Sequence, residues 1–175
     1  MSEANGKTKL LFVDVDGVLS VPDFPDAGTA GPRVGMPEED WLEYCVRNGD
    51  ASYAGCSAAP CAKRYAEKKK AEGAETFVLT AVRTSFEADA KRKFVREKYG
   101  GAFDRFVAVG NSSDKLPVIL AIAKTKGARP EECEIVEDDY GTLIECHRAG
   151  IKATHVVSVA AWHENGETSG AEAPE

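Results

Sequence analysis

The chain has 175 residues, of which 43% are hydrophobic and 29% are charged, a composition that fits one globular domain with its own core. Its net charge of -7 argues against nonspecific binding to nucleic acids or to anionic membranes, because both need a basic protein surface. No apolar run reaches the roughly 20 residues that span a bilayer, and the N-terminus lacks the apolar segment of a signal peptide, so we expect a cytoplasmic protein with no membrane partner.

The first predicted strand delivers two acids into one small space. Residues 10–19 read LLFVDVDGVL, and the apolar run at 10–13 suits a strand buried on both faces. Asp14 and Asp16 follow with their side chains on the same side of an extended chain, and Gly17 lets the backbone turn away. Two carboxylates this close repel unless a cation lies between them or one carries a proton. The alternative is that they only cap a turn.

An insertion follows this strand. Residues 21–35 are rich in Pro and Gly and predict a loop or flap. Residues 37–46 then predict a short helix that ends near Asn48 and Gly49. We expect a single domain over residues 9–163, with this flap or cap insertion at about 20–59 and flexible ends at 1–8 and 164–175.

The rest of the chain alternates helices and strands. Helices are predicted over 60–72, from Thr84 onward, from 111–114 onward and over 141–149, and strands over 76–79, 103–109, 134–136 and 154–159. The helix from Thr84 has a predicted capping box with Glu87. Its apolar positions recur at helical spacing: Phe86, Ala90, Phe94 and Val95.

This alternation predicts an α/β fold in which a parallel five-stranded sheet carries helices on both faces. Ligands of such sheets bind at the carboxyl ends of the strands, near the point where the strand order reverses. Polar residues from distant parts of the chain fall at predicted strand ends, and we expect them to converge at one edge: Asp14, Asp16, Thr80 and Asp138.

The late acidic cluster Glu137, Asp138 and Asp139 indicates a cation site. Three acids in a row at a strand end repel unless a cation is present, and a site made only of oxygen ligands favours Mg²⁺. Asp14, Asp138 and a backbone carbonyl could supply part of the metal's shell. The alternative is that the cluster caps the next helix, which explains one acid better than three.

A carboxylate beside Mg²⁺ is an available nucleophile toward a phosphorus atom. Asp14 would then form an acyl phosphate, while Asp16 would protonate the leaving oxygen and later deprotonate the water. Thr80 and Lys115 offer donors for the charged phosphoryl oxygens. Arg83 is a candidate for a second phosphate contact, although a surface role fits it equally well.

The stretch around Asp14 resembles the first motif of the haloacid dehalogenase-like (HAD) superfamily, hhhhDxDGh. Thr80 corresponds to the Ser or Thr of the second motif, Lys115 to the lysine of the third, and VEDD resembles the fourth. The resemblance, over roughly residues 9–159, implies a Rossmann-like three-layer sandwich and Mg²⁺-dependent chemistry through an aspartyl phosphate. It implies a metal site of Asp14, Asp16 and Asp138, and leaves open whether Glu137 or Asp139 joins Asp138.

The resemblance also narrows the choice within the superfamily. The second acid, Asp16, is typical of phosphatases and phosphomutases, whereas dehalogenases lack it. The insertion is too short for the large helical cap of many members, so we expect a minimal cap or none. The leading hypothesis is a phosphatase, a hydrolase of phosphomonoesters whose substrate is a phosphorylated small molecule or macromolecule. The alternatives are a phosphomutase or phosphotransferase, and a catalytically silent binding protein with the HAD fold.

The five cysteines are odd in number and irregularly spaced, which predicts reduced thiols rather than a disulfide framework. Cys45, Cys56 and Cys61 are the candidates for a zinc site. No CxxC pair or nearby His supports one, so the role of these three residues stays open.

Overall fold

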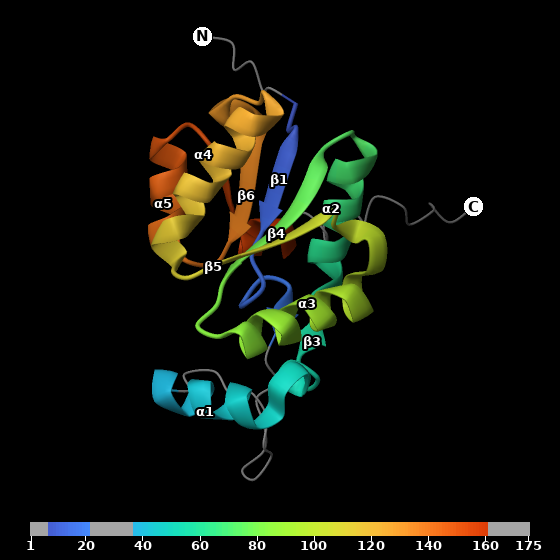
Figure 1. Ribbon diagram of the computed structural model, residues 1–175. Helices are drawn as coiled ribbons and strands as arrows, with labels where there is room; N and C mark the ends of the chain where they lie inside the picture. The colour runs from blue at the N-terminus through green and yellow to red at the C-terminus, as the bar shows by residue number, and fades with distance from the viewer. Residues whose placement is uncertain (1–6, 22–36, 161–175) are drawn as a thin grey trace, which may run out of the picture.

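The computed structural model describes residues 7–21 and 37–160. The predicted flexible ends, apart from Lys7 and Thr8, and nearly all of the predicted loop at 21–35 therefore lie outside the described residues. The centre of the molecule is a five-stranded parallel sheet in the order β5-β4-β1-β6-β7 (Figure 1). Its strands are β1 (Leu10–Val13), β4 (Glu75–Ala81), β5 (Arg105–Val109), β6 (Cys133–Glu137) and β7 (Lys152–His155). The predicted α/β class is confirmed.

Strand β1 separates two hydrophobic cores because its side chains alternate between the faces of the sheet. Leu11 and Val13 pack with α2 (Pro60–Ala71) and α3 (Ser85–Tyr99) on one face. Leu10 and Phe12 pack with α4 (Lys115–Lys126) and α5 (Tyr140–Arg148) on the other. Figure 1 shows the resulting three layers, with α4 and α5 on one side of the sheet and α2 and α3 on the other.

The insertion leaves and re-enters the domain through a small antiparallel pair, β2 (Ser20–Val21) and β3 (Ser57–Ala58). Its described part holds α1 (Glu38–Asn48), as predicted, followed by the 3₁₀ turn η1 (Gly49–Ala51). Helix α1 lies beyond the carboxyl ends of the sheet strands (Figure 1). Three further 3₁₀ turns precede strands or helices of the domain: η2 (Gly100–Ala102), η3 (Ser112–Asp114) and η4 (Pro130–Glu132).

Tyr99, at the end of α3, fixes both ends of the insertion. Its buried hydroxyl donates a hydrogen bond to the Leu19 carbonyl at 2.5 Å and accepts one from the Ala59 backbone N–H at 2.8 Å. Aromatic rings continue this contact into the insertion, since Tyr53 lies between Trp41 of α1 and Phe94 of α3. The insertion is therefore packed against α3 rather than attached only through its two chain ends.

Two elements differ from the prediction. The strand predicted over 154–159 is β7, which ends at His155, and residues 156–160 are helical. The partner strand explains this, because His155 pairs with Glu137, the last residue of β6. In α3, Phe86 is exposed although it continues the apolar spacing, and Glu87 is buried in its place.

None of the helices formed by residues 7–21 and 37–160 combines the length and the apolar character that a membrane span requires.

Candidate active site

Three carboxylates meet where β1 and β6 end. The parallel register pairs Val13 with Val136. The residues that follow them, Asp14 and Glu137, therefore lie side by side at this edge of the sheet. One oxygen each of Asp14, Glu137 and Asp138 lies within 4.8 Å of the other two. Asp14 and Glu137 are buried, whereas Asp138 is exposed. The predicted convergence of the first and last acidic segments is thus present.

Lys115 brings a buried positive charge to these acids from the N-terminal end of α4. Its ammonium lies 2.6 Å from Oε2 of Glu137 and 3.1 Å from Oδ1 of Asp14. Burial lowers the pKa of Lys115, but Asp14 and Glu137 outweigh that effect and raise it above its ordinary value. Lys115 therefore stays charged at neutral pH and offsets part of the repulsion between the acids.

Asp14 is not fully satisfied by Lys115. Burial raises the pKa of Asp14 to about 7, although Lys115 opposes this rise. Its buried Oδ1 atom makes no hydrogen bond to any group in the described residues, and the contact with Lys115 is an ion pair only. A buried carboxylate oxygen without a donor is costly. A divalent cation beside Asp14 would remove that cost, and the three-carboxylate group fits a hard cation that prefers oxygen ligands.

Gly17 makes room for Asp138. Its φ is +70°, and a Cβ atom built there would lie 2.1 Å from Oδ2 of Asp138. The turn after β1 therefore closes directly onto the acid that follows β6. Only glycine satisfies both the left-handed backbone and this close approach.

The acids of the late cluster, Glu137, Asp138 and Asp139, have different partners in the structure. Asp139 is the N-cap of α5, because its Oδ2 accepts hydrogen bonds from the backbone N–H and the hydroxyl of Thr142, both at 2.7 Å. Glu137 is buried beside Lys115 and accepts the backbone N–H groups of Asp138 and Asp139 on Oε1. Glu137, rather than Asp139, therefore lies with Asp138 and Asp14.

The carboxylate of Asp16 lies outside the three-carboxylate group of the described residues and has partners of its own. Tyr53 of the insertion donates its hydroxyl to Oδ1 at 2.7 Å, and the ammonium of Lys91 lies 2.6 Å from Oδ2. The Asp16 side chain is 55% exposed, so it remains open to solvent and to a substrate. Both of its oxygens are nevertheless held by a donor.

Thr80 and Arg83 follow the neighbouring strand β4. Thr80 is fully buried, and its hydroxyl accepts a hydrogen bond from Lys91 at 3.2 Å. Arg83 is exposed and donates to Oδ1 of Asn111 at 2.7 Å and to the Gly110 carbonyl at 3.3 Å. Thr80 thus reaches Asp16 through Lys91, while Arg83 joins the loops that follow β4 and β5.

The sequence prediction did not include Lys91 and gave Glu87 only a capping role, but both are buried charges on α3. Glu87 accepts the backbone N–H of Arg83 at 2.7 Å, in place of the Thr84 N–H that a complete capping box would use, and pairs with Lys91 at 3.0 Å. Their four-residue spacing puts them on the same stripe as Ala90 and Phe94. A Glu and Lys pair within an apolar stripe is the signal that could have identified them.

The cysteines considered for zinc lie apart from these acids in the chain. Cys45 belongs to α1, Cys56 precedes β3 and Cys61 belongs to α2. None of them belongs to the one group that residues 7–21 and 37–160 offer a metal ion. Burial raises the pKa of Cys45 to about 11, which describes a protonated thiol at neutral pH.

No family model and no curated protein matches this sequence. Its structure, however, is similar to solved HAD hydrolases. A haloacid dehalogenase-like family hydrolase from Streptococcus pneumoniae is similar with a TM-score of 0.51 and 17% identity, over 89% of this chain and 91% of that chain. A HAD-family enzyme from Bacteroides thetaiotaomicron, solved with magnesium and inorganic phosphate, is similar with a TM-score of 0.52 and 14% identity, over 83% of this chain and 92% of that chain.

A third similar structure is 3-deoxy-D-manno-octulosonate 8-phosphate phosphatase from Moraxella catarrhalis, solved with a magnesium ion, a phosphate ion and a KDO molecule. Its TM-score is 0.50 at 20% identity, over 83% of this chain and 66% of that chain. At such identities the similarity shows the fold alone. The chain therefore has the HAD-like fold, a Rossmann-like parallel sheet between helical layers, as the resemblance of its motifs implied.

Proposed function

We propose that this protein is a Mg²⁺-dependent phosphatase that hydrolyses phosphomonoesters through an aspartyl phosphate on Asp14. The observation that carries the proposal is the meeting of Asp14, Glu137 and Asp138 within 4.8 Å of one another beside the buried ammonium of Lys115. The similar structures that were solved with magnesium and phosphate support the same chemistry.

The residues present fit Mg²⁺. Asp14 and Asp138 would hold the ion, with Glu137 behind them, and the sequence resemblance adds Asp16 to the ligand set. Because the Asp16 carboxylate is held by Tyr53 and Lys91, its backbone carbonyl is the better candidate for that contact. When bound, Mg²⁺ would neutralise charge on the phosphoryl oxygens and align the phosphorus for in-line attack.

Asp14 and Asp16 divide the covalent work. An oxygen of Asp14 attacks the phosphorus, and the bond from phosphorus to the leaving oxygen breaks while Asp16 gives that oxygen a proton. In the second half Asp16 takes a proton from water, whose oxygen attacks the phosphorus of the acyl phosphate. Asp14 then leaves as a carboxylate, and inorganic phosphate is released.

Lys115, Thr80 and Arg83 act as donors toward the phosphoryl group in this proposal. Lys115 is fixed by Glu137 at 2.6 Å, so its charge costs no reorganisation during the reaction. The Thr80 hydroxyl accepts a hydrogen bond from Lys91 and donates a long one, 3.4 Å, to the Ala81 carbonyl, which it would exchange for a hydrogen bond to a phosphoryl oxygen. Arg83, exposed at the same edge, is a candidate for a second contact to a substrate phosphate.

Replacing Asp14 with Asn tests the proposal. The purified wild-type chain should release phosphate from p-nitrophenyl phosphate with Mg²⁺ and lose this activity in EDTA. Asp14→Asn should lower kcat at least about 10³-fold, because an amide is a poor nucleophile. Asp89→Asn makes the same change at an exposed acid of α3 that pairs with Arg92, and it should keep full activity. Equal activity of the two variants would remove Asp14 from its proposed role.

The products separate the alternative functions. A phosphatase releases inorganic phosphate from a sugar phosphate, whereas a phosphomutase or phosphotransferase returns an isomer or a new ester. A silent binding protein would hydrolyse nothing in a panel of nucleotides, sugar phosphates and phosphopeptides while still binding Mg²⁺. Phosphate release from any member of the panel would exclude that last alternative.

A further inference from the structure

Lys91 is a buried cation for which the proposed chemistry has no role yet. Its side chain is 1% exposed on α3, and a buried ammonium is costly unless oxygen atoms receive its protons. Four oxygens surround it: Asp16 Oδ2 at 2.6 Å, the Ala81 carbonyl at 2.6 Å, Glu87 Oε1 at 3.0 Å and Thr80 Oγ1 at 3.2 Å. Lys91 is therefore held in one place by three separate segments of the chain.

The contacts of Lys91 fall into two groups. Glu87 and the Ala81 carbonyl hold the ammonium from its own helix and from the end of β4. Glu87 is itself fixed by the backbone N–H of Arg83 at 2.7 Å. The other two oxygen contacts of Lys91 go to Thr80 and Asp16, both of which have a role in the proposed reaction.

Neutralising Glu87 does not account for the contact with Asp16. The pair of Lys91 with Glu87 already balances one positive and one negative buried charge. Asp16 is 55% exposed, so water could solvate its carboxylate without any help from a lysine. Its oxygens are instead fixed by two donors from different elements, Lys91 of α3 and Tyr53 of the insertion. A carboxylate on a turn would otherwise rotate freely.

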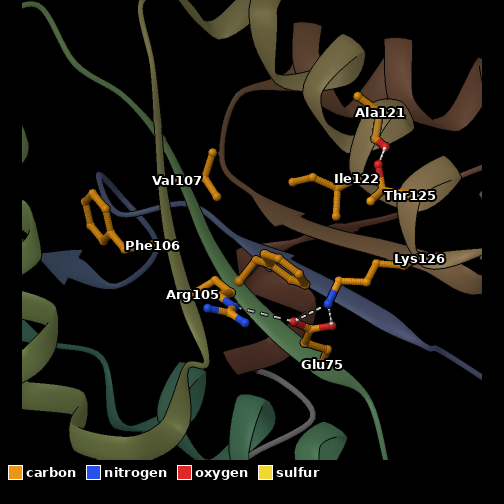
Figure 2. A pocket seen from close by; sticks show the side chains of 9 residues that line it. Glu75, Arg105, Phe106, Val107, Ala121, Ile122, Thr125 and Lys126 are labelled. Carbon is orange, nitrogen blue, oxygen red and sulfur yellow. Dashed lines mark hydrogen bonds and ion pairs between the residues drawn. The ribbon is translucent and has the colours of Figure 1, made fainter.

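A groove of about 430 Å³ elsewhere in the described part of the chain offers no comparable site. It lies between β5 and α4, near the starts of β4 and β5 and thus away from the acids. Figure 2 shows its charged residues paired with each other, since Glu75 contacts both Lys126 and Arg105. No polar group there is shown to be left for a ligand.

We propose that Lys91 is a positioning residue, which together with Tyr53 orients the carboxylate of Asp16 for proton transfer to the leaving oxygen. The inference rests on the proposed phosphatase activity. As Asp14 forms its bond to phosphorus, the electron pair of the breaking P–O bond goes to the leaving oxygen, which takes the proton of Asp16. A misplaced Asp16 slows this step most when the leaving oxygen is strongly basic.

The test compares two leaving groups. p-Nitrophenolate leaves without needing a proton, whereas phenolate is far more basic and needs one. Lys91→Met keeps the length of the side chain and removes the charge. It should lower kcat/KM about tenfold with p-nitrophenyl phosphate and at least about 100-fold with phenyl phosphate, within the range that a general acid supplies. Lys91→Arg should restore part of the difference.

Two further variants separate positioning from folding. Lys93→Met makes the same change two residues along α3, at a partly exposed lysine that pairs with Asp50, and it should leave both substrates unaffected. Tyr53→Phe keeps the ring and removes only the hydroxyl on Asp16. It should lower kcat/KM less than Lys91→Met does, again more with phenyl phosphate than with p-nitrophenyl phosphate. If Lys91→Met does not fold, Tyr53→Phe alone tests whether Asp16 must be oriented.

The outcomes distinguish this inference from the function on which it rests. The wild-type chain could be active while Lys91→Met and Tyr53→Phe lose activity equally toward both esters, or toward neither. That result would overturn the positioning role alone. A wild-type chain that releases phosphate from neither ester overturns the proposed function, and the role of Lys91 falls with it. A selective loss with phenyl phosphate in either variant supports the inference.

Discussion

Gly17 sets the distance between the two acidic segments at the scale of single residues. The Asp138 carboxylate occupies the space that a side chain at position 17 would need, 2.1 Å from the position of a Cβ atom. The turn at Gly17 is closed by a hydrogen bond from its backbone N–H to the Ser20 carbonyl at 3.1 Å, so the Asp138 side chain is the group that would have to shift. The glycine therefore contributes to the geometry of the proposed metal site.

Gly17→Ala should displace Asp138 and abolish Mg²⁺-dependent activity. We expect it to destabilise the fold by about 1–3 kcal/mol, because alanine is strained at φ +70° and its methyl group overlaps the carboxylate. Urea unfolding and a Mg²⁺ titration of activity measure both effects. Gly127→Ala is the matched control, since Gly127 has φ +64° with nothing within 4 Å of a built Cβ. An active Gly17→Ala enzyme with the stability of Gly127→Ala would contradict this account.

Local pattern predicted some of the candidate site residues and not others. Asp14, Asp16 and Gly17 were predictable because a strand and the turn after it are encoded by neighbouring residues. The contacts of Lys91 with Asp16, Thr80 and Ala81 were not predictable, because these partners come from segments that only the fold brings to α3. The sequence also could not predict which of Glu137 and Asp139 lies beside Asp14 and Asp138, since this depends on where β6 ends and α5 begins.

At the scale of elements, Glu134 joins β6 to its neighbours. This carboxylate is fully buried on the amino side of the strand, away from Asp14. It accepts hydrogen bonds from Tyr65 of α2 at 2.5 Å, Thr154 of β7 at 2.9 Å and Thr8 at 3.0 Å. Two ammonium groups lie beside it, Lys69 at 2.9 Å and Lys152 at 3.2 Å. Burial raises the pKa of Glu134, but Tyr65 and the lysines outweigh burial and lower it.

Glu134 should therefore make the free energy of unfolding depend on pH. A carboxyl group whose pKa is lowered by folding stabilises the folded state above its unfolded pKa of about 4.3, and this contribution is lost as the pH falls through the folded value. Glu134→Gln should cost about 3 kcal/mol at pH 7, because it leaves buried donors without a charged partner, and the cost should shrink as the pH falls below about 4. Urea unfolding across this pH range measures both.

Glu75→Gln is the control for that variant. Glu75 pairs with Lys126 and Arg105 at the groove between β5 and α4, where its side chain is 26% exposed (Figure 2). Ion pairs of this kind are worth about 1 kcal/mol or less. If both substitutions had the same cost at pH 7 and at low pH, the role given to Glu134 would be wrong.

The order and type of the sheet strands and of the helices between them followed from the sequence, but the small pair β2 and β3 and the end of β7 did not. Valines at 156, 157 and 159 favour a strand by their intrinsic propensity. Yet β6 offers no residue beyond Glu137 for them to pair with. The helical turn at 156–160 instead buries Val159 and leaves Val157 exposed. Strand length was therefore decided by the neighbouring strand, which no local pattern reveals.

At the scale of the whole molecule, the proposed metal site would couple folding to the binding of a cation. A cation that binds only the folded chain adds about 2.7 kcal/mol at a concentration 100-fold above its Kd. For a domain of this size we expect the thermal midpoint to rise by about 5–10 °C between EDTA and such a Mg²⁺ concentration. Asp138→Asn should remove most of this rise, and calorimetry measures it without any substrate.

Asp139→Asn provides the comparison for this experiment. Asp139 caps α5 through Thr142, and asparagine is also a good N-cap residue, so the Mg²⁺-dependent rise should survive. Equal loss of the rise in both variants would show that Asp138 has no special place at the metal. An unchanged midpoint in the wild-type chain would remove Mg²⁺ from the proposed function.

The fold class could be predicted from the alternation of strands and helices, but the strand order could not. Placing β1 between β4 and β6 depends on how the two cores fill, and both cores draw on segments that are far apart in the chain. The packing of the insertion against α3 through Tyr53 and Tyr99 was likewise not predictable, because it rests on contacts between distant segments.

The position of β6 also decides when the proposed active site could form during synthesis. Asp14 leaves the ribosome more than a hundred residues before Glu137 and Asp138, and it stays without them until β6 has added to the free edge of β1. A nascent chain that stops before β6 would carry Asp14, Asp16 and Lys115 but no place for a cation. The proposed hydrolysis would therefore require that translation has passed β6.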